Sequence, residues 1–307
     1  MNCRICSQKT VPFLKCLDFE FRKNPMYLVQ CSSCNTILVD PIPEKNELAK
    51  YYENSYYHKP SFFFNFIQKR RKRFFSNMTP GKVLDVGCGT GNFLETMQQA
   101  EWTCSGTEFS TSSKPFLEPL RKKGISIQYG ELKQLDFPQD SFDLVTFWHV
   151  IEHLQFPQQE IATAHKLIKK NGLLFIAIPN IDSLSFAFWK CNWFHLDLPR
   201  HLVLFSPKTI TSLLEKNGFE VIRISHFAIE YNPYGVLQSI YNALGFEFNL
   251  LTQKIKAQKK NKTLSSKLQL GLVFLSLPLL LPISFLLAYI FSIIGRGDTI
   301  SVWARKR

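Results

Sequence analysis

The feature that most constrains this chain is the segment at residues 83–93, which reads Val-Leu-Asp-Val-Gly-Cys-Gly-Thr-Gly-Asn-Phe. An apolar run that holds an acid and passes into three alternating glycines predicts a buried strand, a tight turn and a helix that begins near Asn92. Glycine is required in such a turn because a side chain would keep a ligand away from the backbone. The segment therefore predicts a nucleotide-type cofactor site, and taken alone it leaves a nicotinamide cofactor open.

Residues 81–228 alternate strand and helix signals, which is typical of a parallel sheet with helices on both faces. We expect strands at residues 82–86, 103–108, 126–129, 143–148, 173–178 and 220–227, and one more at 299–305. Helices are expected at residues 92–99, 113–123, 158–170 and 207–217. Gly172 and Gly218 follow two of these helices, where a left-handed cap favours glycine. The predicted fold class is α/β.

Polar residues before and after the turn distinguish between the cofactors that it could bind. Asp85 stands ahead of the glycines, where it would repel a pyrophosphate but suits the cationic amino-acid end of S-adenosylmethionine. Glu108 ends the next strand, where a carboxylate can accept both ribose hydroxyls of either cofactor. Gly130-Glu-Leu132 follows the third strand, and Asp140-Ser-Phe-Asp143 leads into the fourth. Together these positions favour S-adenosylmethionine.

The order of these motifs resembles that of class I S-adenosylmethionine-dependent methyltransferases. The likeness is greatest for a small-molecule branch in which His149-Val-Ile-Glu-His-Leu154 and then Pro199-Arg-His-Leu202 with Phe205-Ser206 follow the glycine turn. It covers residues 81–228 and the last strand, and it implies a Rossmann-like sheet of seven strands with the last one antiparallel. Some members of this branch, including sugar and glycan-cluster enzymes, carry an N-terminal zinc ribbon similar to the one described below.

The resemblance also implies which residues contact the cofactor. By this likeness the methionine end is lined by Asp85, Gly87, Gly89 and Gly91. Glu108 is expected to hold the ribose, and Glu131 with Leu132 to flank the adenine. Glu131 has an equally weighted alternative as a surface acid in a turn.

Methyl transfer needs groups that position the acceptor and remove its proton. His149, His153 and His201 are the candidates, because neutral imidazole takes a proton near neutral pH. His149 follows the fourth strand, and His201 lies in an aromatic segment at residues 189–205 that resembles a lid, so both are predicted catalytic bases of equal standing. His149 and His153 also have the spacing of helical metal ligands, but the resemblance places them against the cofactor, and we expect no metal there.

Two Cys-x-x-Cys pairs stand near the N-terminus, and 24 residues separate them. They are formed by Cys3 with Cys6 and by Cys31 with Cys34. Such spacing predicts a zinc ribbon, and four thiolates leave no position for water, so the zinc is expected to be structural. Unpaired buried cysteines are the alternative. Cys16 is left over, and we expect it to pack as a small hydrophobic residue.

The connection to the sheet combines aromatic and basic runs. Residues 44–57 read as a tyrosine-rich helix, followed by Phe-Phe-Phe-Asn-Phe at residues 62–66 and Lys-Arg-Arg-Lys-Arg at residues 69–73. The basic run could contact phosphates or could form the solvated face of a helix.

Near the C-terminus, residues 254–267 hold six Lys and no acid, and residues 268–294 then run for 27 residues without a charge. That length suits a membrane-spanning helix, but the strand at 299–305 must return to the sheet that holds the strand at 220–227. We therefore expect a hairpin, broken at Pro278 and Pro282, that enters one leaflet and returns, with the lysines and Arg296 on anionic headgroups. A buried helical pair or a dimer face is the alternative.

These features divide the chain into four parts. They are a zinc ribbon at 1–40, a helical linker and lid at 41–80, a methyltransferase domain at 81–230 with 298–307, and a basic and apolar insert at 231–297. The net charge of +13 suits an anionic partner, and because much of it flanks the insert we expect a membrane surface rather than nucleic acid. No secretory signal is visible, so the expected location is the cytoplasm, peripheral or monotopic at the inner face of the membrane.

The sequence thus predicts an S-adenosylmethionine-dependent methyltransferase with a small-molecule acceptor, in particular a sugar, a glycan or a lipid-linked group. An RNA methyltransferase is one alternative, because a zinc ribbon and a positive charge also suit RNA. A membrane adaptor that keeps the fold without catalysis is the other. Nucleic acid retained through purification would favour the first, and failure to bind S-adenosylmethionine would favour the second.

Overall fold

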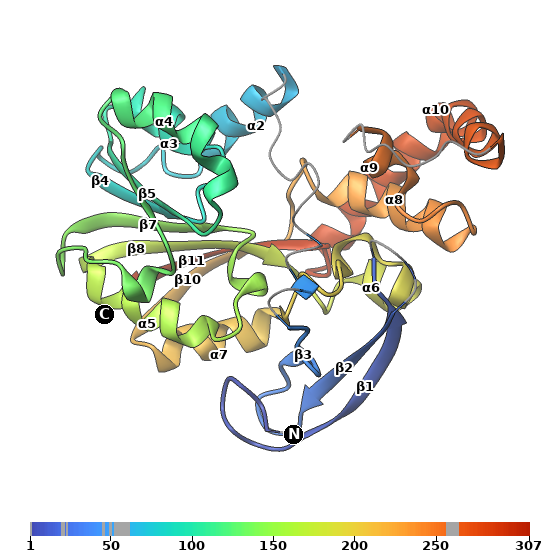
Figure 1. Cartoon of the computed structure of the whole chain (residues 1–307), viewed down its shortest axis with the longest axis horizontal. Helices are drawn as coiled ribbons and strands as arrows, with labels where there is room; N and C mark the ends of the chain where they lie inside the picture. Colours follow the sequence, from blue (N-terminus) through green and yellow to red (C-terminus); the bar gives the residue numbers. More distant parts are fainter. Residues whose placement is uncertain are drawn as a thin grey trace.

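Figure 1 shows the computed structural model, which describes residues 2–19, 22, 24–44, 47–48, 51, 62–255 and 264–307. A seven-stranded sheet forms the centre, a four-stranded sheet lies below it, and a group of helices projects to the right. Most of the helix expected at residues 44–57 lies outside the described residues, as do the side chains of residues 62–66.

The central sheet has the strand order β10–β11–β8–β7–β4–β5–β6. Its strands are β4 (Lys82–Val86), β5 (Thr103–Glu108), β6 (Ser126–Tyr129), β7 (Phe142–Trp148), β8 (Ile168–Pro179), β10 (Phe219–Ser225) and β11 (Thr299–Lys306). Neighbouring strands are parallel, except that β11 is antiparallel to both β8 and β10. The predicted seven-stranded sheet with an antiparallel last strand is confirmed.

Two layers of helices cover the sheet (Figure 1). Helices α3 (Asn92–Gln98) and α4 (Lys114–Lys122) lie on one face, and α5 (Pro157–Leu167) and α7 (Pro207–Lys216) lie on the other. Val83 of β4 packs in the core under α3 and α4, whereas its neighbour Leu84 packs in the core under α5 and α7. Both faces of β4 are buried because successive side chains of a strand point to opposite sides.

Several strand boundaries differ from the prediction by one or two residues, and the largest difference is at the start of β8. Helix α5 ends at Leu167 and β8 begins at Ile168, so Gly172 lies inside the strand rather than in a helix cap. Ile168 pairs with Phe142 of β7, and the pairing then shifts in register before Leu173. Strand pairing therefore sets this boundary. Gly218 follows α7 with a φ of 83°, as its predicted cap position requires.

The N-terminal residues form an antiparallel sheet that a later segment extends. Its strands are β1 (Thr10–Leu17), β2 (Pro25–Cys31), β3 (Ile37–Val39) and β9 (Val203–Leu204). In the pairing of β3 with β9, Ile37 faces Leu204 and Leu38 faces Val203. The segment before β9 holds α6 (Leu184–Trp189) and the short 3-10 helices η4 (Lys190–Asn192) and η5 (Phe194–Leu196). We call the N-terminal residues 2–39, which include β1, β2 and β3, the ribbon. The ribbon is thereby joined to the part of the chain expected to form the lid, residues 189–205.

The remaining helices are α2 (Phe62–Arg73) before β4, and α8 (Asn232–Ala243), α9 (Leu250–Ile255) and α10 (Leu264–Ile293) between β10 and β11. The predicted hairpin is wrong, because α10 continues through Pro278 and Pro282. Val273 in its first half packs with Leu237 of α8, and Ala288 in its second half packs with Val236. Packing of both halves along α8 holds α10 in one piece.

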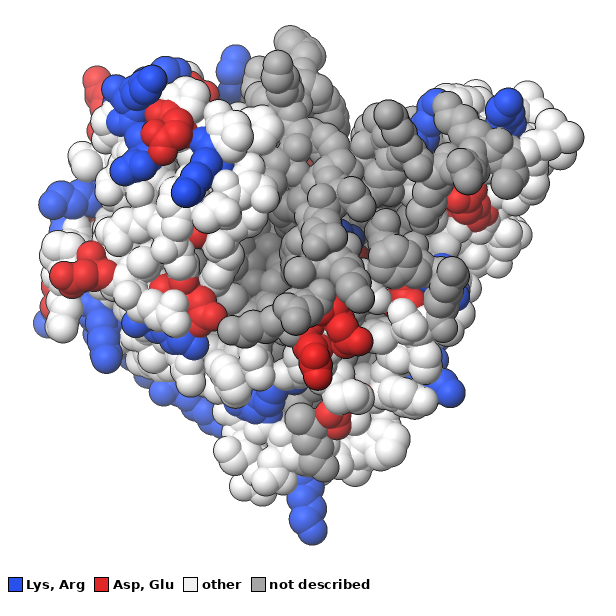
Figure 2. Space-filling view, viewed as in Figure 1, with Lys and Arg blue, Asp and Glu red and all other residues white. Residues whose placement is uncertain are grey.

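Helix α10 leaves most of its apolar side chains exposed. Leu275 is 80% exposed and Leu279 is 66% exposed, and exposed leucine, isoleucine and phenylalanine side chains continue to Ile294. Figure 2 shows much of this projecting arm as uncharged surface, whereas Lys and Arg gather over α3 and α4. Among the described residues, α10 is the one helix whose length and composition would allow it to cross a membrane.

Candidate active site

The glycine turn joins β4 to α3 at the carboxyl edge of the sheet. Gly87, Gly89 and Gly91 have φ values of 69°, 58° and 74°, which L side chains rarely adopt. A Cβ on Gly87 would lie 2.6 Å from Val150, and one on Gly91 would lie 2.3 Å from Leu120. A Cβ on Gly89 would meet no atom within 4 Å. The turn therefore packs tightly on two sides and leaves open space at Gly89, where a cofactor can approach the backbone.

Asp85 lies near the end of β4 and is 3% exposed. Its Oδ1 accepts a hydrogen bond from Thr146 Oγ1 at 2.6 Å. Burial raises the pKa of Asp85 to about 7, while the Thr146 hydrogen bond and the nearby Arg71 charge oppose the rise. Ionisation of this buried carboxyl is unfavourable without a partner. A cationic ligand group beside it would favour the ionised form.

Glu108 ends β5 beside the glycine turn. Its carboxylate accepts from the backbone N–H of Gly89 at 2.7 Å, and also from those of Phe109 at 2.7 Å and Ser110 at 3.1 Å. These bonds fix an acid at the point where the ribose of a nucleotide-type cofactor lies in this class of sheet.

Glu131 and Leu132 follow β6 at the start of the 3-10 helix η2 (Leu132–Gln134). Leu132 is fully buried in the core, whereas Glu131 is partly exposed and pairs with Lys133 at 2.7 Å. The Glu131 side chain therefore has a surface partner, and the adenine contact stays a prediction.

His149 directly follows β7 and has a φ of 55°. Its ring lies against that of Tyr231, with centroids 4.3 Å apart, and its Nδ1 lies 3.3 Å from Glu152 Oε1. Its Nε2 is buried and has no hydrogen-bond partner among the described residues. Burial lowers the pKa of His149 to about 3 and raises that of Glu152 to about 7. The imidazole is therefore neutral, and its Nε2 makes no hydrogen bond within the described part of the chain.

His153 and His201 form a second pair, with ring centroids 4.7 Å apart. His153 Nδ1 lies 3.0 Å from the Arg200 carbonyl oxygen, and His201 Nδ1 lies 2.9 Å from that of His195. His201 Nε2 lies 3.8 Å from Asp197. Both rings thus contact the backbone of the segment expected to form the lid.

The second pair also belongs to the one noncysteine group in the described part of the chain that could hold a metal ion. Glu152, His153 and His201 offer ligand atoms that lie within 4.8 Å of one another. His149 is not in this group, because residues Ile151–His153 form a single 3-10 turn, η3, rather than the α-helix that a spacing of four residues requires.

Arg71 is a site residue that sequence reasoning missed. It is 9% exposed, its guanidinium stacks on Trp148 at 4.3 Å, and Nη2 donates to the Tyr231 hydroxyl at 2.6 Å. The adjacent Arg70 pairs with Glu230 and so fastens α2 to the loop before α8. The only signal was the basic run at residues 69–73, and a run of five cations does not show which of them faces inward.

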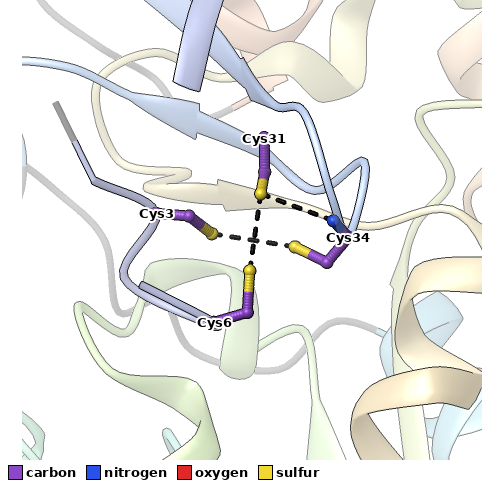
Figure 3. Close-up of side chains that lie close together, drawn as sticks. All are labelled: Cys3, Cys6, Cys31 and Cys34. Carbon is purple, nitrogen blue, oxygen red and sulfur yellow. Dashed lines mark hydrogen bonds between the residues drawn. The ribbon is translucent and has the colours of Figure 1, made fainter. Parts of the chain in front are cut away.

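Figure 3 shows the sulfur atoms of Cys3, Cys6, Cys31 and Cys34 pointing toward one another. Cys3 Sγ lies 3.7 Å from Cys34 Sγ, and Cys6 Sγ lies 3.4 Å from Cys31 Sγ. Backbone N–H groups of Ser33 and Cys34 donate to Cys31 Sγ at 3.4 Å. Four convergent sulfurs near the edge length of a tetrahedron around zinc, with amide donors to a sulfur, fit the donor set of a structural zinc ion.

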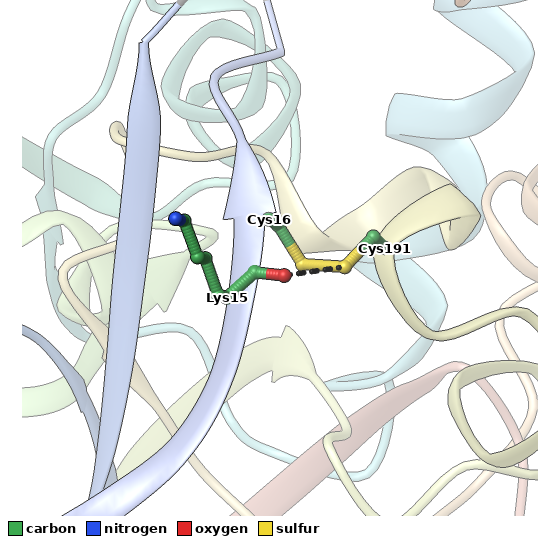
Figure 4. Close-up of a disulfide and its surroundings, with 3 residues drawn as sticks. All are labelled: Lys15, Cys16 and Cys191. Atoms are coloured by element: carbon green, nitrogen blue, oxygen red, sulfur yellow. Dashed lines mark hydrogen bonds between the residues drawn. A yellow bond between two sulfur atoms is a disulfide. The ribbon is translucent and has the colours of Figure 1, made fainter.

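The prediction for Cys16 is wrong, because this residue forms a disulfide with Cys191 (Figure 4). Cys191 lies in η4, which is 175 residues further along the chain, and its Sγ is 3.4 Å from the Lys15 carbonyl oxygen. No local pattern pairs two single cysteines at this distance in sequence. The bond ties β1 of the ribbon to the start of the lid.

Comparison with known proteins agrees with this geometry. A family model for a methyltransferase domain matches residues 57–224. The ubiquinone biosynthesis O-methyltransferase of Actinobacillus pleuropneumoniae is 33% identical over 127 residues, which cover 38% of this chain and 51% of the relative. That of Thiobacillus denitrificans is 28% identical over 162 residues, which cover 50% and 69%. The chain spans about half the length of the first curated relatives it matches.

Three solved structures show the same fold. An S-adenosylmethionine-dependent methyltransferase from Archaeoglobus fulgidus has a TM-score of 0.50 at 19% identity, with 80% of this chain and 100% of that chain covered. The phosphoethanolamine N-methyltransferase 2 of Haemonchus contortus, in complex with S-adenosyl-L-methionine, has a TM-score of 0.50 at 16% identity, with 80% and 53% covered. The [4+2]-cyclase SpnF has a TM-score of 0.51 at 15% identity, with 82% and 86% covered.

The family match covers more than half of the chain, and it includes the glycine turn, Asp85, Glu108 and His149. The cyclase shows that the fold alone does not fix a reaction, so the family assignment rests on the family match. This chain belongs to the methyltransferase domain family.

Proposed function

We propose that the protein methylates a hydroxyl oxygen of a small molecule and that His149 removes the hydroxyl proton. The observation that carries this proposal is the buried, neutral imidazole of His149, whose Nε2 has no partner among the described residues. It follows β7, the strand beside β4, at the edge where Asp85 and Glu108 stand. The relatives named above are O-methyltransferases, which favours oxygen as the acceptor atom.

S-adenosylmethionine supplies a methyl group already activated on a sulfonium, so the chain has to bind, orient and deprotonate. We assign Asp85 to bind the ammonium group of the methionine end. The open space at Gly89 would let the cofactor lie close to the backbone of the turn. Glu108 is assigned to the ribose hydroxyls. The adenine stays assigned to the turn at Glu131 and Leu132.

Arg71 is the natural partner for the carboxylate of the methionine end. Its guanidinium is buried, its Nε has no hydrogen-bond partner, and no ion pair with an acid joins it among the described residues. Its charge acts on the pKa values of both Asp85 and His149, which supports a location near both groups. A buried cation without an anion is costly, and a carboxylate ligand would relieve that cost.

His149 is a better base than His201 in this arrangement. Glu152 lies against His149 Nδ1, where its ionised form would stabilise the imidazolium that forms when Nε2 takes a proton. His201 is tied through Nδ1 to His195, and its other nitrogen faces Asp197. We assign His201 to the ordering of the lid.

We further propose that the four cysteines bind a structural zinc ion and that α10 attaches the protein to a membrane surface. The exposed apolar side of α10 would lie in one leaflet, and the exposed Lys267 and Arg296 near its ends would meet anionic headgroups. Helix α8 begins directly after Tyr231, which contacts His149, and it packs along α10, so the proposed membrane-binding helix is joined to the edge of the sheet that carries the site. A lipid-borne hydroxyl compound is therefore the proposed acceptor, and no relative named above has a sugar or glycan in its name.

The catalytic proposal is tested with methyl-labelled S-adenosylmethionine and a lipid extract of the cells that make the protein. The wild-type protein should transfer label into material that partitions into organic solvent, and His149→Ala should lose at least about a hundredfold of that rate. His201→Ala should lose less. Both variants should bind S-adenosylhomocysteine in a calorimeter as the wild type does. Label transfer that survives in His149→Ala would remove this residue as the base, and label in RNA would favour the alternative acceptor.

The membrane proposal is tested by flotation with vesicles that contain anionic lipid. The double variant Leu275→Glu, Leu279→Glu changes two exposed side chains and should leave the fold intact while it releases the protein from vesicles. Ile222→Glu, at an exposed position of β10, is the matched control and should float as the wild type does. An intact wild-type protein that never floats would overturn the membrane proposal.

A further inference from the structure

The N-terminal ribbon holds the segment that carries His201 at several points. Cys16 is bonded to Cys191, and the Phe19 N–H donates to the Leu198 carbonyl oxygen at 2.8 Å. Strand β3 then pairs with β9, directly after the Pro199-Arg-His-Leu202 motif. Between these anchors stand Asp197, Arg200 and His201, so both ends of the lid segment rest on the ribbon.

Arg4, inside the first Cys-x-x-Cys pair, makes the most direct connection. Its Nη2 donates to the Leu202 carbonyl oxygen at 2.8 Å and its Nη1 donates to that of Val39 at 3.2 Å. The Leu202 N–H in turn donates to the Glu152 carbonyl oxygen at 2.8 Å. Glu152 contacts His149 Nδ1 at 3.3 Å. A continuous series of contacts therefore leads from the cysteine cluster to the proposed base.

The same arginine is fixed from its own backbone. Gln158 of α5 donates to the Arg4 carbonyl oxygen at 2.7 Å, and Cys3 packs in the core beneath α5 and α7. The ribbon thus packs against the central sheet and its helices as well as against the lid segment. A docking module on a flexible linker would not make such contacts.

From these contacts we propose that Arg4 is a positioning residue of the acceptor site, and that the ribbon serves this enzyme by holding residues 196–204 against the loop that carries His149 and Glu152. The inference rests on the proposed function only for the effect on turnover. Arg4 donates its side-chain hydrogen bonds to Val39 and Leu202, and neither bond reaches Asp85, Gly89 or Glu108, so cofactor binding should be independent of Arg4.

The test compares Arg4→Ala, Arg4→Lys and Lys9→Ala in the full-length protein. Lys9 is an exposed cation in the same part of the ribbon and is the matched control. Hydrogen exchange of peptides that cover residues 196–205 should be about tenfold faster in Arg4→Ala, which is the effect of losing one hydrogen bond from a charged donor. Label transfer to the lipid extract should fall by about the same factor. Arg4→Lys, which keeps one donor group, should recover part of both losses.

Three further measurements decide the outcome. The zinc content of Arg4→Ala, its affinity for S-adenosylhomocysteine and the exchange of peptides in β4 and β5 should all match the wild type. Unchanged exchange at residues 196–205 would overturn the proposal, and so would faster exchange throughout the chain, which indicates general destabilisation. Absence of label transfer in the wild type would instead count against the proposed acceptor, because the exchange result is independent of turnover.

Discussion

Asp85→Asn should stabilise the cofactor-free protein at neutral pH while it weakens cofactor binding. Asp85 is 3% exposed, and burial raises its pKa from an ordinary value of about 4 to about 7. A carboxyl group with a raised pKa binds more protons in the folded than in the unfolded state. Its contribution to stability is therefore fully present below pH 4 and is lost as the pH rises to about 7.

The size of this effect follows from the shift in pKa. The pKa of Asp85 is about three units higher in the folded than in the unfolded protein. At pH 8 this difference lowers the free energy of unfolding by about 4 kcal/mol, and at pH 5 it lowers it by about 1.5 kcal/mol. An amide at position 85 does not ionise, and its oxygen can still accept the hydrogen bond from Thr146. The variant should thus gain about 2.5 kcal/mol more at pH 8 than at pH 5, or about 5–10 °C in melting temperature.

Thermal unfolding without cofactor at pH 5 and pH 8 measures the gain, and calorimetry with S-adenosylhomocysteine measures the loss of affinity. Glu118→Gln, at an exposed position of α4, controls for the removal of an acid. An equal gain at both pH values, or a loss at pH 8, would refute the argument from burial. An unchanged affinity would show that Asp85 does not hold the methionine end.

Three other outcomes are expected. Gly91→Ala should destabilise the protein by about 2–3 kcal/mol in thermal unfolding, because its Cβ would clash with a buried leucine at a positive φ, whereas Gly124→Ala meets only the cost of a positive φ and should lose about 1 kcal/mol. Zinc analysis should find one ion per chain and none in Cys31→Ser, and a second ion in the wild type would place a metal at the glutamate and histidine group under the lid. Reduction of the Cys16–Cys191 disulfide should lower the free energy of unfolding by about 2–4 kcal/mol, seen as a lower melting temperature of the wild type in reductant. The melting temperature of Cys16→Ser, which lacks this disulfide, should not change with reductant.

The local sequence was sufficient to predict β4, the glycine turn and the start of α3. The residues from Lys82 to Asn92 specify a strand, a turn and a helix start within one short segment, because buried strands need apolar runs and the turn needs backbone that only glycine adopts freely. The two Cys-x-x-Cys pairs were equally readable. Their spacing predicts a metal site, and the structure brings their sulfur atoms together.

Where the prediction failed, the deciding partner lay far along the chain. Pro278 and Pro282 suggested a break, but α10 stays continuous because it packs along α8. Cys16 showed no sign of Cys191, and the basic run did not distinguish Arg71 from its exposed neighbours.

The sequence by itself determined the class of sheet, the glycine turn and the cysteine cluster, because each depends on residues that are close together or on a repeating local pattern. Only the tertiary structure decided that the buried His149 Nε2 lacks a hydrogen-bond partner, that Arg71 is the arginine of the basic run that packs on Trp148, and that Arg4 bonds to Leu202. These outcomes depend on burial and on contacts between segments up to 198 residues apart. Such contacts exist only once the sheet has brought those segments to one edge.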